Sequence, residues 1–374
     1  MRQTQSYYDL DLLARLLLGP GPSMVHPRVL RAMATPLVGY LDPSYLAVMD
    51  ETQELLRMVF QTQNPLTLAL PGTGSAGMEA ALYNFIEEGD PVLICVAGYF
   101  GERMVEMATR ARADVRRIDV PWGQVISERQ VAQALDERPA KLVAIVHGET
   151  STGIAQPLHG IAEVVHRHGA LLLVDTVASL GGVSVPVDEI GIDICYTGSQ
   201  KCLSAPPGLA PITVGPRAEA ALAARTTKVQ SWYLDLTLQR KYWNAERVYH
   251  HTGPASMMFA LREALRLVAE EGLAARFERH AQVSRLLWEG LEARGMSMLV
   301  PPEYRLASLT TVRVPAGVDE AAVRGRLLAE YNVDIAGALG ALKGRYWRIG
   351  LMGQSCRPEN VVTLLGALDR VLAG

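Results

Sequence analysis

Four groups of residues, far apart in the chain, are of types that carry out chemistry. The first is Lys201, which ends the small, polar stretch Thr197-Gly-Ser-Gln-Lys201 directly after the apolar run Ile192 to Tyr196. A lysine held among apolar residues has a lowered pKa, and its neutral amine forms imines with carbonyl groups. A lone lysine is more often a solvated loop residue. A catalytic role for Lys201 is therefore supported only when other residues of the chain fit the same chemistry.

The second group is the turn Pro71-Gly-Thr-Gly-Ser75. It follows the strand-like residues 67–70 and precedes a helical stripe over residues 76–86. At the start of a helix the free backbone N–H groups and the positive helix end bind phosphate, and the hydroxyls of Thr73 and Ser75 add donors. An ordinary tight turn with a Ser or Thr cap has the same pattern.

The third and fourth groups are Asp175 and Arg348. Asp175 directly follows the buried-type residues 171–174, so it is either a turn cap or a charge placed for a partner. Arg348 lies inside the apolar stretch Tyr346-Trp-Arg-Ile-Gly350. An arginine there either extends to the surface or faces a cleft, where it binds a carboxylate with two hydrogen bonds.

The elements that must position these groups alternate between strand and helix. The pattern predicts an α/β fold, with a mainly parallel sheet covered by helices and the ligand at the carboxyl ends of the strands. Predicted strands cover 67–70, 92–96, 115–118, 142–146, 171–174 and 192–196; predicted helices cover 29–33, 45–60, 76–86, 102–112, 128–134, 158–167, 261–268 and 276–291.

The C-terminal part alternates differently and predicts a smaller α+β domain. Its predicted strands cover 309–314, 333–335 and 347–351, and its helices cover 320–331 and 359–372. We expect an N-terminal arm over 1–22 that is helical to residue 17, a large domain over 23–258 and a small domain over 259–374. The aromatic and charged segment 225–249 has little periodicity, which is typical of an interface or an active-site wall.

Composition excludes several classes of protein. The 374 residues carry 36 basic and 39 acidic side chains, for a net charge of −3, and no basic run that would bind nucleic acid. No apolar run reaches the roughly 18 residues of a membrane span. The four cysteines show no C-x-x-C spacing, and Cys95 and Cys195 lie in apolar strand-like runs, which predicts buried thiols rather than disulfides or a zinc site. The adjacent His250 and His251 do not favour a metal site. We expect a cytoplasmic protein without metal, nucleic-acid or membrane partners.

Together the four groups are the set that pyridoxal-phosphate chemistry requires. The turn takes the phosphate, Asp175 pairs with the pyridine nitrogen, Lys201 binds the aldehyde and moves the proton, and Arg348 holds the substrate carboxylate. The chain also resembles the class V aminotransferases of fold type I, closest to the alanine–glyoxylate (serine–pyruvate) aminotransferases. The motifs that carry this resemblance are Leu18-Gly-Pro-Gly-Pro-Ser23, Phe60-Gln-Thr-Gln-Asn-Pro-Leu66, His147-Gly-Glu-Thr-Ser-Thr-Gly153, Leu173-Val-Asp-Thr-Val-Ala-Ser-Leu-Gly-Gly182, Thr197-Gly-Ser-Gln-Lys201, Tyr233-Leu-Asp235, Tyr249-His-His-Thr252 and Arg348-Ile-Gly-Leu351.

The resemblance implies a role for each matching residue. Lys201 and Asp175 would be catalytic, with Lys201 linked covalently to the cofactor. The phosphate would be held by Thr73, Gly74, Ser75 and Gln200, and by Tyr249 and Thr252 from the second subunit of a homodimer. Phe100 and Val177 would lie on the two faces of the ring, Ser151 near its O3′ and the substrate, and Arg348 at the substrate carboxylate. Animal relatives have Trp where Phe100 stands and often His where Ser75 stands, and both differences bear on cofactor affinity.

The predicted reaction transfers an amino group from L-alanine or L-serine to glyoxylate or pyruvate in two half-reactions. A dicarboxylate donor such as aspartate would need a second cation, which Arg240 or Arg247 would supply only if residues 225–249 fold over the site. A cysteine desulfurase or lyase is an alternative, although Gln200 stands where desulfurases have His and Cys356 has no activating base. A scaffold protein that keeps the fold without catalysis is the remaining alternative.

Overall fold

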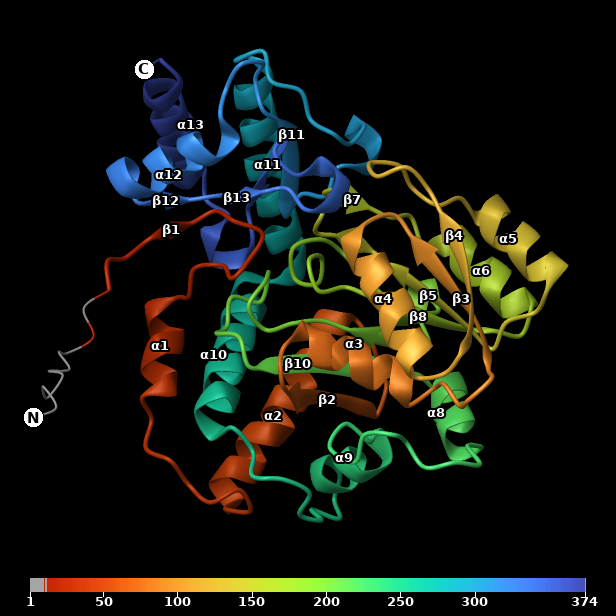
Figure 1. The fold of residues 1–374 in the computed structure, drawn as a ribbon. Helices are drawn as coiled ribbons and strands as arrows, with labels where there is room; N and C mark the ends of the chain where they lie inside the picture. The colour runs from red at the N-terminus through yellow and green to blue at the C-terminus, as the bar shows by residue number, and fades with distance from the viewer. Residues whose placement is uncertain (1–9, 11, 374) are drawn as a thin grey trace, which may run out of the picture.

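The computed structural model describes residues 10 and 12–373, and residues 1–9, 11 and 374 lie outside that description. Its larger part is a sheet with helices packed against it. A smaller part, which contains the C-terminus, lies at one end of this body (Figure 1). This is the α/β architecture that the sequence predicts, with a second, smaller α+β region.

Seven strands of the described residues form the central sheet. In spatial order they are β2 (Leu66–Pro71), β10 (Leu209–Val214), β9 (Ile194–Tyr196), β8 (Leu171–Asp175), β5 (Leu142–Val146), β3 (Pro91–Val96) and β4 (Asp114–Asp119). Neighbouring strands run parallel except where β10 pairs with β2 and with β9. The inner strands β5, β8, β9 and β10 are buried along their whole length, as expected for a sheet covered on both faces.

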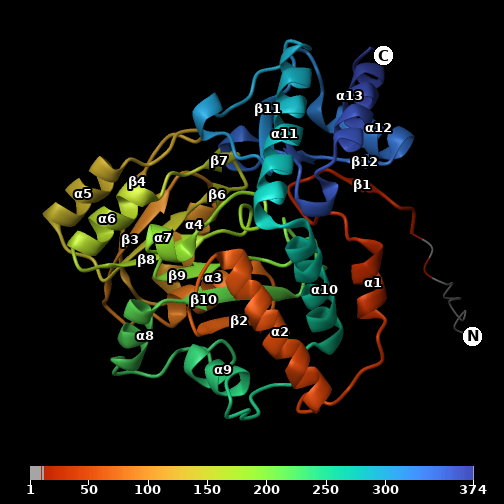
Figure 2. The ribbon, with the colours of Figure 1, turned by 180° about the vertical axis from the view of Figure 1, so that it is seen from behind.

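Helices cover both faces of the sheet (Figures 1 and 2). The helices of this larger part are α1 (Pro27–Met33), α2 (Pro43–Phe60), α3 (Gly74–Tyr83), α4 (Tyr99–Arg110), α5 (Glu128–Glu137), α6 (His159–Arg167), α7 (Val187–Ile190), α8 (Pro216–Ala223), α9 (Leu236–Trp243) and α10 (Ala255–Glu271), on which α1 packs. Helix α3 packs on β2, β10 and β9, and α4 packs on β3, β4 and β5. These two helices begin at the edge of the sheet where the predicted ligand site lies.

The smaller part contains an antiparallel sheet in the order β11 (Leu309–Arg313), β14 (Tyr346–Gly350) and β13 (Ala336–Gly337). Its helices are α11 (Leu273–Glu292), α12 (Glu320–Tyr331) and α13 (Pro358–Leu372). The short strand β1 (Leu16–Leu17) pairs in parallel with β12 (Val333–Asp334), so the start of the chain lies beside this C-terminal part. The two-stranded hairpin β6 (Gly148–Glu149) and β7 (Ile154–Ala155) lies between the two parts.

Several predicted elements need correction. The prediction of a helix over residues 1–17 is wrong for Leu16 and Leu17, because these two residues form a strand with β12. Residues 1–9 and 11 of this arm lie outside the described part of the chain. The segment 225–249, predicted without periodicity, contains α9, whose first turn is capped by the Asp235 carboxylate. Strand β10 and helix α8 were not predicted. The proline in β10, Pro211, argues locally against a strand.

The apolar side chains form two main cores. The first surrounds the central sheet and includes apolar residues of α10 as far as Val268; the second joins Leu18 to α11, α12, α13 and β14. The division of the chain at residues 22 and 258 stays a prediction. The packing of α10 in the first core favours a second boundary near Gly272.

Candidate active site

The ends of neighbouring strands and the start of α3 surround one cavity. β8 ends at Asp175, β9 leads into residues 197–201, and β2 leads through Gly72 into α3. The cavity has a volume of about 180 Å³ and is lined by Thr73, Gly74, Ser75, Met78, Phe100, Arg103, Asp175, Val177, Gln200 and Lys201. Most of the residues predicted to bind the cofactor therefore meet at the carboxyl edge of the sheet, where such folds bind ligands.

Lys201 lines this cavity with a partly buried side chain. Its Nζ donates a hydrogen bond to the Pro20 carbonyl and lies close to Gly21, whose φ of +117° is a backbone conformation that residues with a Cβ rarely adopt. The backbone of the lysine is held by Ser23, whose Oγ donates to the Lys201 carbonyl at 2.7 Å. Burial lowers the pKa of Lys201 to about 8. About a tenth of the amine is therefore neutral and nucleophilic at pH 7, far more than for an unperturbed lysine.

Asp175 is buried at the end of β8, and its carboxylate is oriented by two hydrogen bonds. Oδ2 accepts a bond of 2.6 Å from the Tyr196 hydroxyl, and Oδ1 accepts one of 2.7 Å from the Val177 backbone N–H. Burial raises the pKa of Asp175 to about 6, while these two bonds act in the opposite direction. Above that pH the group is a fixed carboxylate with unused lone pairs that suit a protonated ring nitrogen.

The start of α3 forms an anion-binding cradle. Thr73 is its N-cap residue, but its side chain makes no capping hydrogen bond. The cradle packs closely on the floor of the cavity, because a Cβ added at Gly74 would lie 3.0 Å from Val177 Cγ2. The side-chain oxygen of Gln200 is buried and has no hydrogen-bond partner in the part of the chain that is described. An anion that takes up the free donors, with the Gln200 amide turned toward it, fits this arrangement.

The β6–β7 hairpin does not line the cavity; it packs against the start of α4, and its residue Ser151 lies behind that part of the wall. Ser151 Oγ accepts a hydrogen bond of 2.9 Å from the Tyr99 N–H and donates one of 2.6 Å to Glu149 Oε1. The other oxygen of Glu149 accepts bonds from the N–H groups of Phe100 at 3.1 Å and Gly101 at 3.3 Å. The buried Glu149 thus ties Ser151 to the start of α4, which carries Phe100.

Arg348 lies in β14, beside the hairpin loop, and is 6% exposed. Its Nε donates to the Gly337 carbonyl at 3.0 Å and its Nη1 to the Thr150 carbonyl at 3.2 Å. Nη2 makes no hydrogen bond within the described residues. Burial lowers the pKa of Arg348 to about 10, so the side chain is still a cation at neutral pH. A buried arginine with one free edge is a suitable carboxylate clamp.

Tyr249 and Thr252 do not line the cavity of their own chain. Tyr249 is 51% exposed and packs against Tyr40 with the two rings tilted, their centroids 4.8 Å apart. Its hydroxyl contacts Thr252 Oγ1 at 3.5 Å. The two residues lie together on the surface, separate from the other predicted phosphate ligands.

Three residues at the site were missed in the sequence: Arg103, Glu149 and Tyr196. Arg103 lies on an amphipathic helix, where a lone arginine is usually solvated. Tyr196 ends a buried strand, so the sequence pattern predicts a side chain of the apolar core. Only Glu149 had a local signal, since it belongs to the polar loop 147–153 between two apolar runs.

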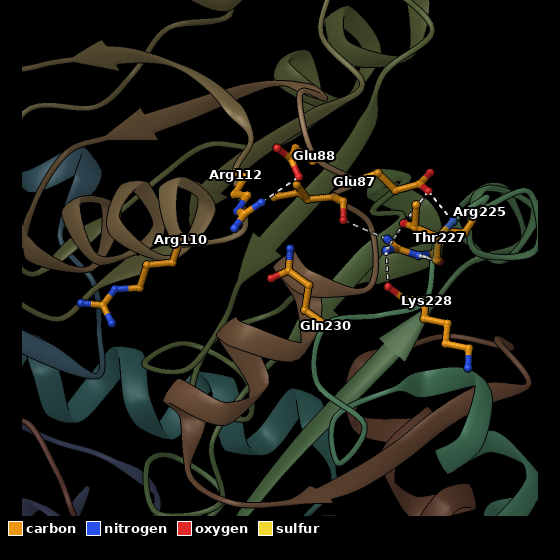
Figure 3. A pocket seen from close by; sticks show the side chains of 9 residues that line it. Glu87, Glu88, Arg110, Arg112, Arg225, Thr227, Lys228 and Gln230 are labelled. Atoms are coloured by element: carbon orange, nitrogen blue, oxygen red, sulfur yellow. Dashed lines mark hydrogen bonds and ion pairs between the residues drawn. The ribbon is translucent and has the colours of Figure 1, made fainter.

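A larger hollow of about 450 Å³ lies elsewhere on the molecule and has no comparable chemistry (Figure 3). Most of its charges are paired within the protein: Arg112 pairs with Glu88 at 3.0 Å, and Arg225 donates to main-chain carbonyls. Glu87 accepts hydrogen bonds from the backbone and hydroxyl groups of Thr226 and Thr227. We therefore assign the chemistry to the smaller cavity.

None of the described helices combines the length and apolar character needed to cross a membrane. Within residues 10 and 12–373, no three or more His, Cys, Asp or Glu side chains are grouped to hold a metal ion. His250 and His251 contact each other through their Nδ1 atoms at 2.9 Å. All four cysteines are buried and free, as expected for Cys95 and Cys195.

Comparison with known proteins agrees with this geometry. Residues 17–341 match the model of the class V aminotransferase family. The chain is 42% identical to the (S)-ureidoglycine–glyoxylate transaminase of Bacillus subtilis, over 96% of this chain and 90% of that protein. It is 41% identical to the alanine–glyoxylate aminotransferase of Mus musculus, over 97% and 89%. The crystal structure of an alanine–glyoxylate aminotransferase from Nostoc sp. superposes with a TM-score of 0.98 at 53% identity, covering 99% of this chain and 98% of that one.

The donor set of the cavity fits the cofactor of this family. The cradle suits a phosphate, Asp175 suits a pyridine nitrogen, and Lys201 suits an aldehyde carbon. When bound, pyridoxal phosphate supplies a ring that accepts electrons from the substrate. The chain belongs to the class V aminotransferases, which are pyridoxal-phosphate enzymes of fold type I.

Proposed function

We propose that this enzyme transfers the amino group of L-alanine or L-serine to glyoxylate or pyruvate. The observation that carries the proposal is that one carboxylate clamp, Arg348, has a free edge near the site. The two arginines that would have signalled a dicarboxylate donor are engaged elsewhere. Arg240 pairs with Glu219 at 3.2 Å, and Arg247 pairs with Asp50. The relatives named for alanine and glyoxylate support the same substrates.

The residues divide the work by position and charge. Arg348 holds the substrate α-carboxylate and so fixes which bond at the α-carbon faces the ring. Once the substrate has displaced Lys201, its neutral amine takes the proton from the substrate α-carbon and delivers it to C4′ of the cofactor. Asp175 keeps the ring nitrogen protonated. Phe100 and Val177 would hold the ring from its two faces, and Ser151 would contact O3′ and the substrate.

We also propose a homodimer in which Tyr249 and Thr252 complete the phosphate site of the second subunit. Exposed apolar side chains near these residues support it, since Tyr40 is 37% and Trp232 is 62% exposed. Surface aromatic residues of this kind are enriched at interfaces. The dimer is tested by sedimentation at several concentrations.

We also propose a cytoplasmic location. The four buried, free cysteines support it, because disulfides are rare in that compartment.

The substrate proposal is tested with the absorption spectrum of the enzyme loaded with pyridoxal phosphate. We expect L-alanine or L-serine to remove the yellow absorbance and glyoxylate to restore it. L-Aspartate, L-cysteine and (S)-ureidoglycine are tested in the same way. Lys201→Ala is the control and should lack the absorbance of the lysine-linked cofactor.

The possible results separate the alternatives. A kcat/KM for aspartate or glutamate that exceeds that for alanine by orders of magnitude would overturn the proposed donors. Sulfide release from cysteine without amino transfer would indicate a desulfurase. No yellow absorbance after addition of pyridoxal phosphate would favour the scaffold.

A further inference from the structure

Arg103 is a cation in the cavity, and none of the roles predicted from the sequence was assigned to it. It lies on α4, one turn after Phe100, and lines the cavity together with the cradle and Lys201. Its Nη1 donates a hydrogen bond of 2.8 Å to Ser75 Oγ. The guanidinium carbon lies 4.8 Å from the ring centroid of Phe100 and 5.4 Å from that of Tyr99. These contacts hold the guanidinium beside the cradle rather than in solvent.

Among the described residues no Asp or Glu forms an ion pair with Arg103, whereas Arg110 on the same helix pairs with Glu106 at 2.7 Å. Asp175 lines the same cavity and the charge of Arg103 helps to lower its pKa, but its carboxylate accepts its hydrogen bonds from Tyr196 and Val177 and makes none with Arg103. A partly buried, unpaired cation beside free helix N–H groups is costly unless an anion binds there.

The hydrogen bond to Ser75 also fixes the direction of the serine hydroxyl. A guanidinium has only donors, so Ser75 Oγ must be the acceptor in this bond. Its own hydrogen is then free to be donated to a third group. An anion bound at the start of α3 would lie next to Ser75, which lines the cavity.

We propose that Arg103 is a phosphate-binding residue, whose guanidinium and oriented Ser75 hydroxyl together hold the phosphate of the cofactor. Thr73, Gly74 and Ser75 supply short neutral donors, and Arg103 supplies the positive charge. The inference rests on the assignment of pyridoxal phosphate to this cavity. It makes the site selective for the phosphorylated cofactor over pyridoxal, which has the same ring and aldehyde but no phosphate.

The test measures the Kd of both cofactor forms by absorbance titration of the full chain after removal of its cofactor. Arg103→Gln removes the charge and keeps a donor for Ser75. Arg110→Gln is the matched control, because it removes the same charge from the exposed end of the same helix. We expect Arg103→Gln to raise the Kd of pyridoxal phosphate about 10- to 100-fold, the range for a charge-assisted hydrogen bond, and that of pyridoxal less than about threefold. Arg110→Gln should change neither.

Arg103→Lys serves as the rescue variant and should recover part of the lost affinity, since it restores the charge without the planar fork. Equal weakening of both cofactor forms would overturn the proposal and give Arg103 a role in placing Phe100. Unchanged affinity for both forms would overturn it as well. Failure of the wild-type protein to bind pyridoxal phosphate would instead overturn the cofactor assignment, so the two failures are distinguishable.

Discussion

Replacing Tyr196 with phenylalanine removes one hydroxyl from the buried carboxylate of Asp175. In the wild-type protein this hydroxyl donates a bond of 2.6 Å to Oδ2. A hydrogen bond to a charged group contributes about 1.5–3 kcal/mol, and one pKa unit corresponds to about 1.4 kcal/mol. The substitution should therefore raise the pKa of Asp175, now about 6, by roughly one to two pH units.

The sign of the effect on stability follows from proton uptake. Because the pKa of Asp175 in the folded protein lies above its ordinary value of 3.8, the folded state holds the proton longer than the unfolded state does. The free energy of unfolding therefore falls as the pH rises from about 4 through about 6. In Tyr196→Phe this fall continues to higher pH. The variant should lose about 1.5–3 kcal/mol more than the wild type between pH 5 and pH 8.

The assay is urea unfolding of the cofactor-free protein at pH 5 and pH 8. Tyr242→Phe is the matched control, because the buried Tyr242 donates its hydroxyl bond of 2.8 Å to an uncharged acceptor, the Tyr40 carbonyl. Its cost should be the same at both pH values. A cost of Tyr196→Phe that is equal at pH 5 and pH 8 would refute the reasoning, because Tyr196 would then not act on the ionised form of Asp175.

Three further substitutions test the site and the fold. Arg348→Gln should raise the KM of both amino acid and oxo acid about 10- to 100-fold and leave the Kd of pyridoxal phosphate unchanged, as measured by steady-state kinetics and titration; an unchanged KM would remove its role as a clamp. Glu149→Gln turns an acceptor for four N–H and O–H donors partly into a donor, so urea unfolding should show a loss of about 1–3 kcal/mol, and no loss would contradict this. Burial lowers the pKa of His280 to about 3, so the unfolding free energy of the wild type should fall as the pH drops from about 6.5 toward 3. His280→Ala should remove this part of the pH dependence, and an unchanged pH profile would count against it.

Local sequence signals were enough where the chain forms an element from its own residues. Helix α12 begins and ends at the predicted residues because the Asp319 carboxylate caps its first turn and Asn332 adopts a left-handed conformation after its last. The apolar runs of the sheet were found for a similar reason, since a strand buried on both faces has almost no polar residue.

Contacts between distant parts of the chain could not be predicted in this way. Leu16 and Leu17 form a strand only because Val333 and Asp334 lie beside them, and no local pattern shows this pairing. The same holds for Arg103, because its place in the cavity shows only in its hydrogen bond to Ser75, a residue on another helix. The polar motifs identify which residues belong to the site, but the orientation of Asp175 by Tyr196 depends on the register of two strands.

The segment from Leu16 to Ser23 joins two places that must act together. Its start pairs with β12 in the C-terminal part, its middle accepts a bond of 2.7 Å from the Gly350 N–H to the Leu18 carbonyl, and its end fastens the backbone of Lys201. Gly350 lies two residues after Arg348 in the same strand. The segment thus links the strand that carries Arg348 to the backbone of Lys201 through a short length of chain. A shift of the C-terminal part relative to the central sheet would therefore strain the hydrogen bonds that this segment makes at its two ends.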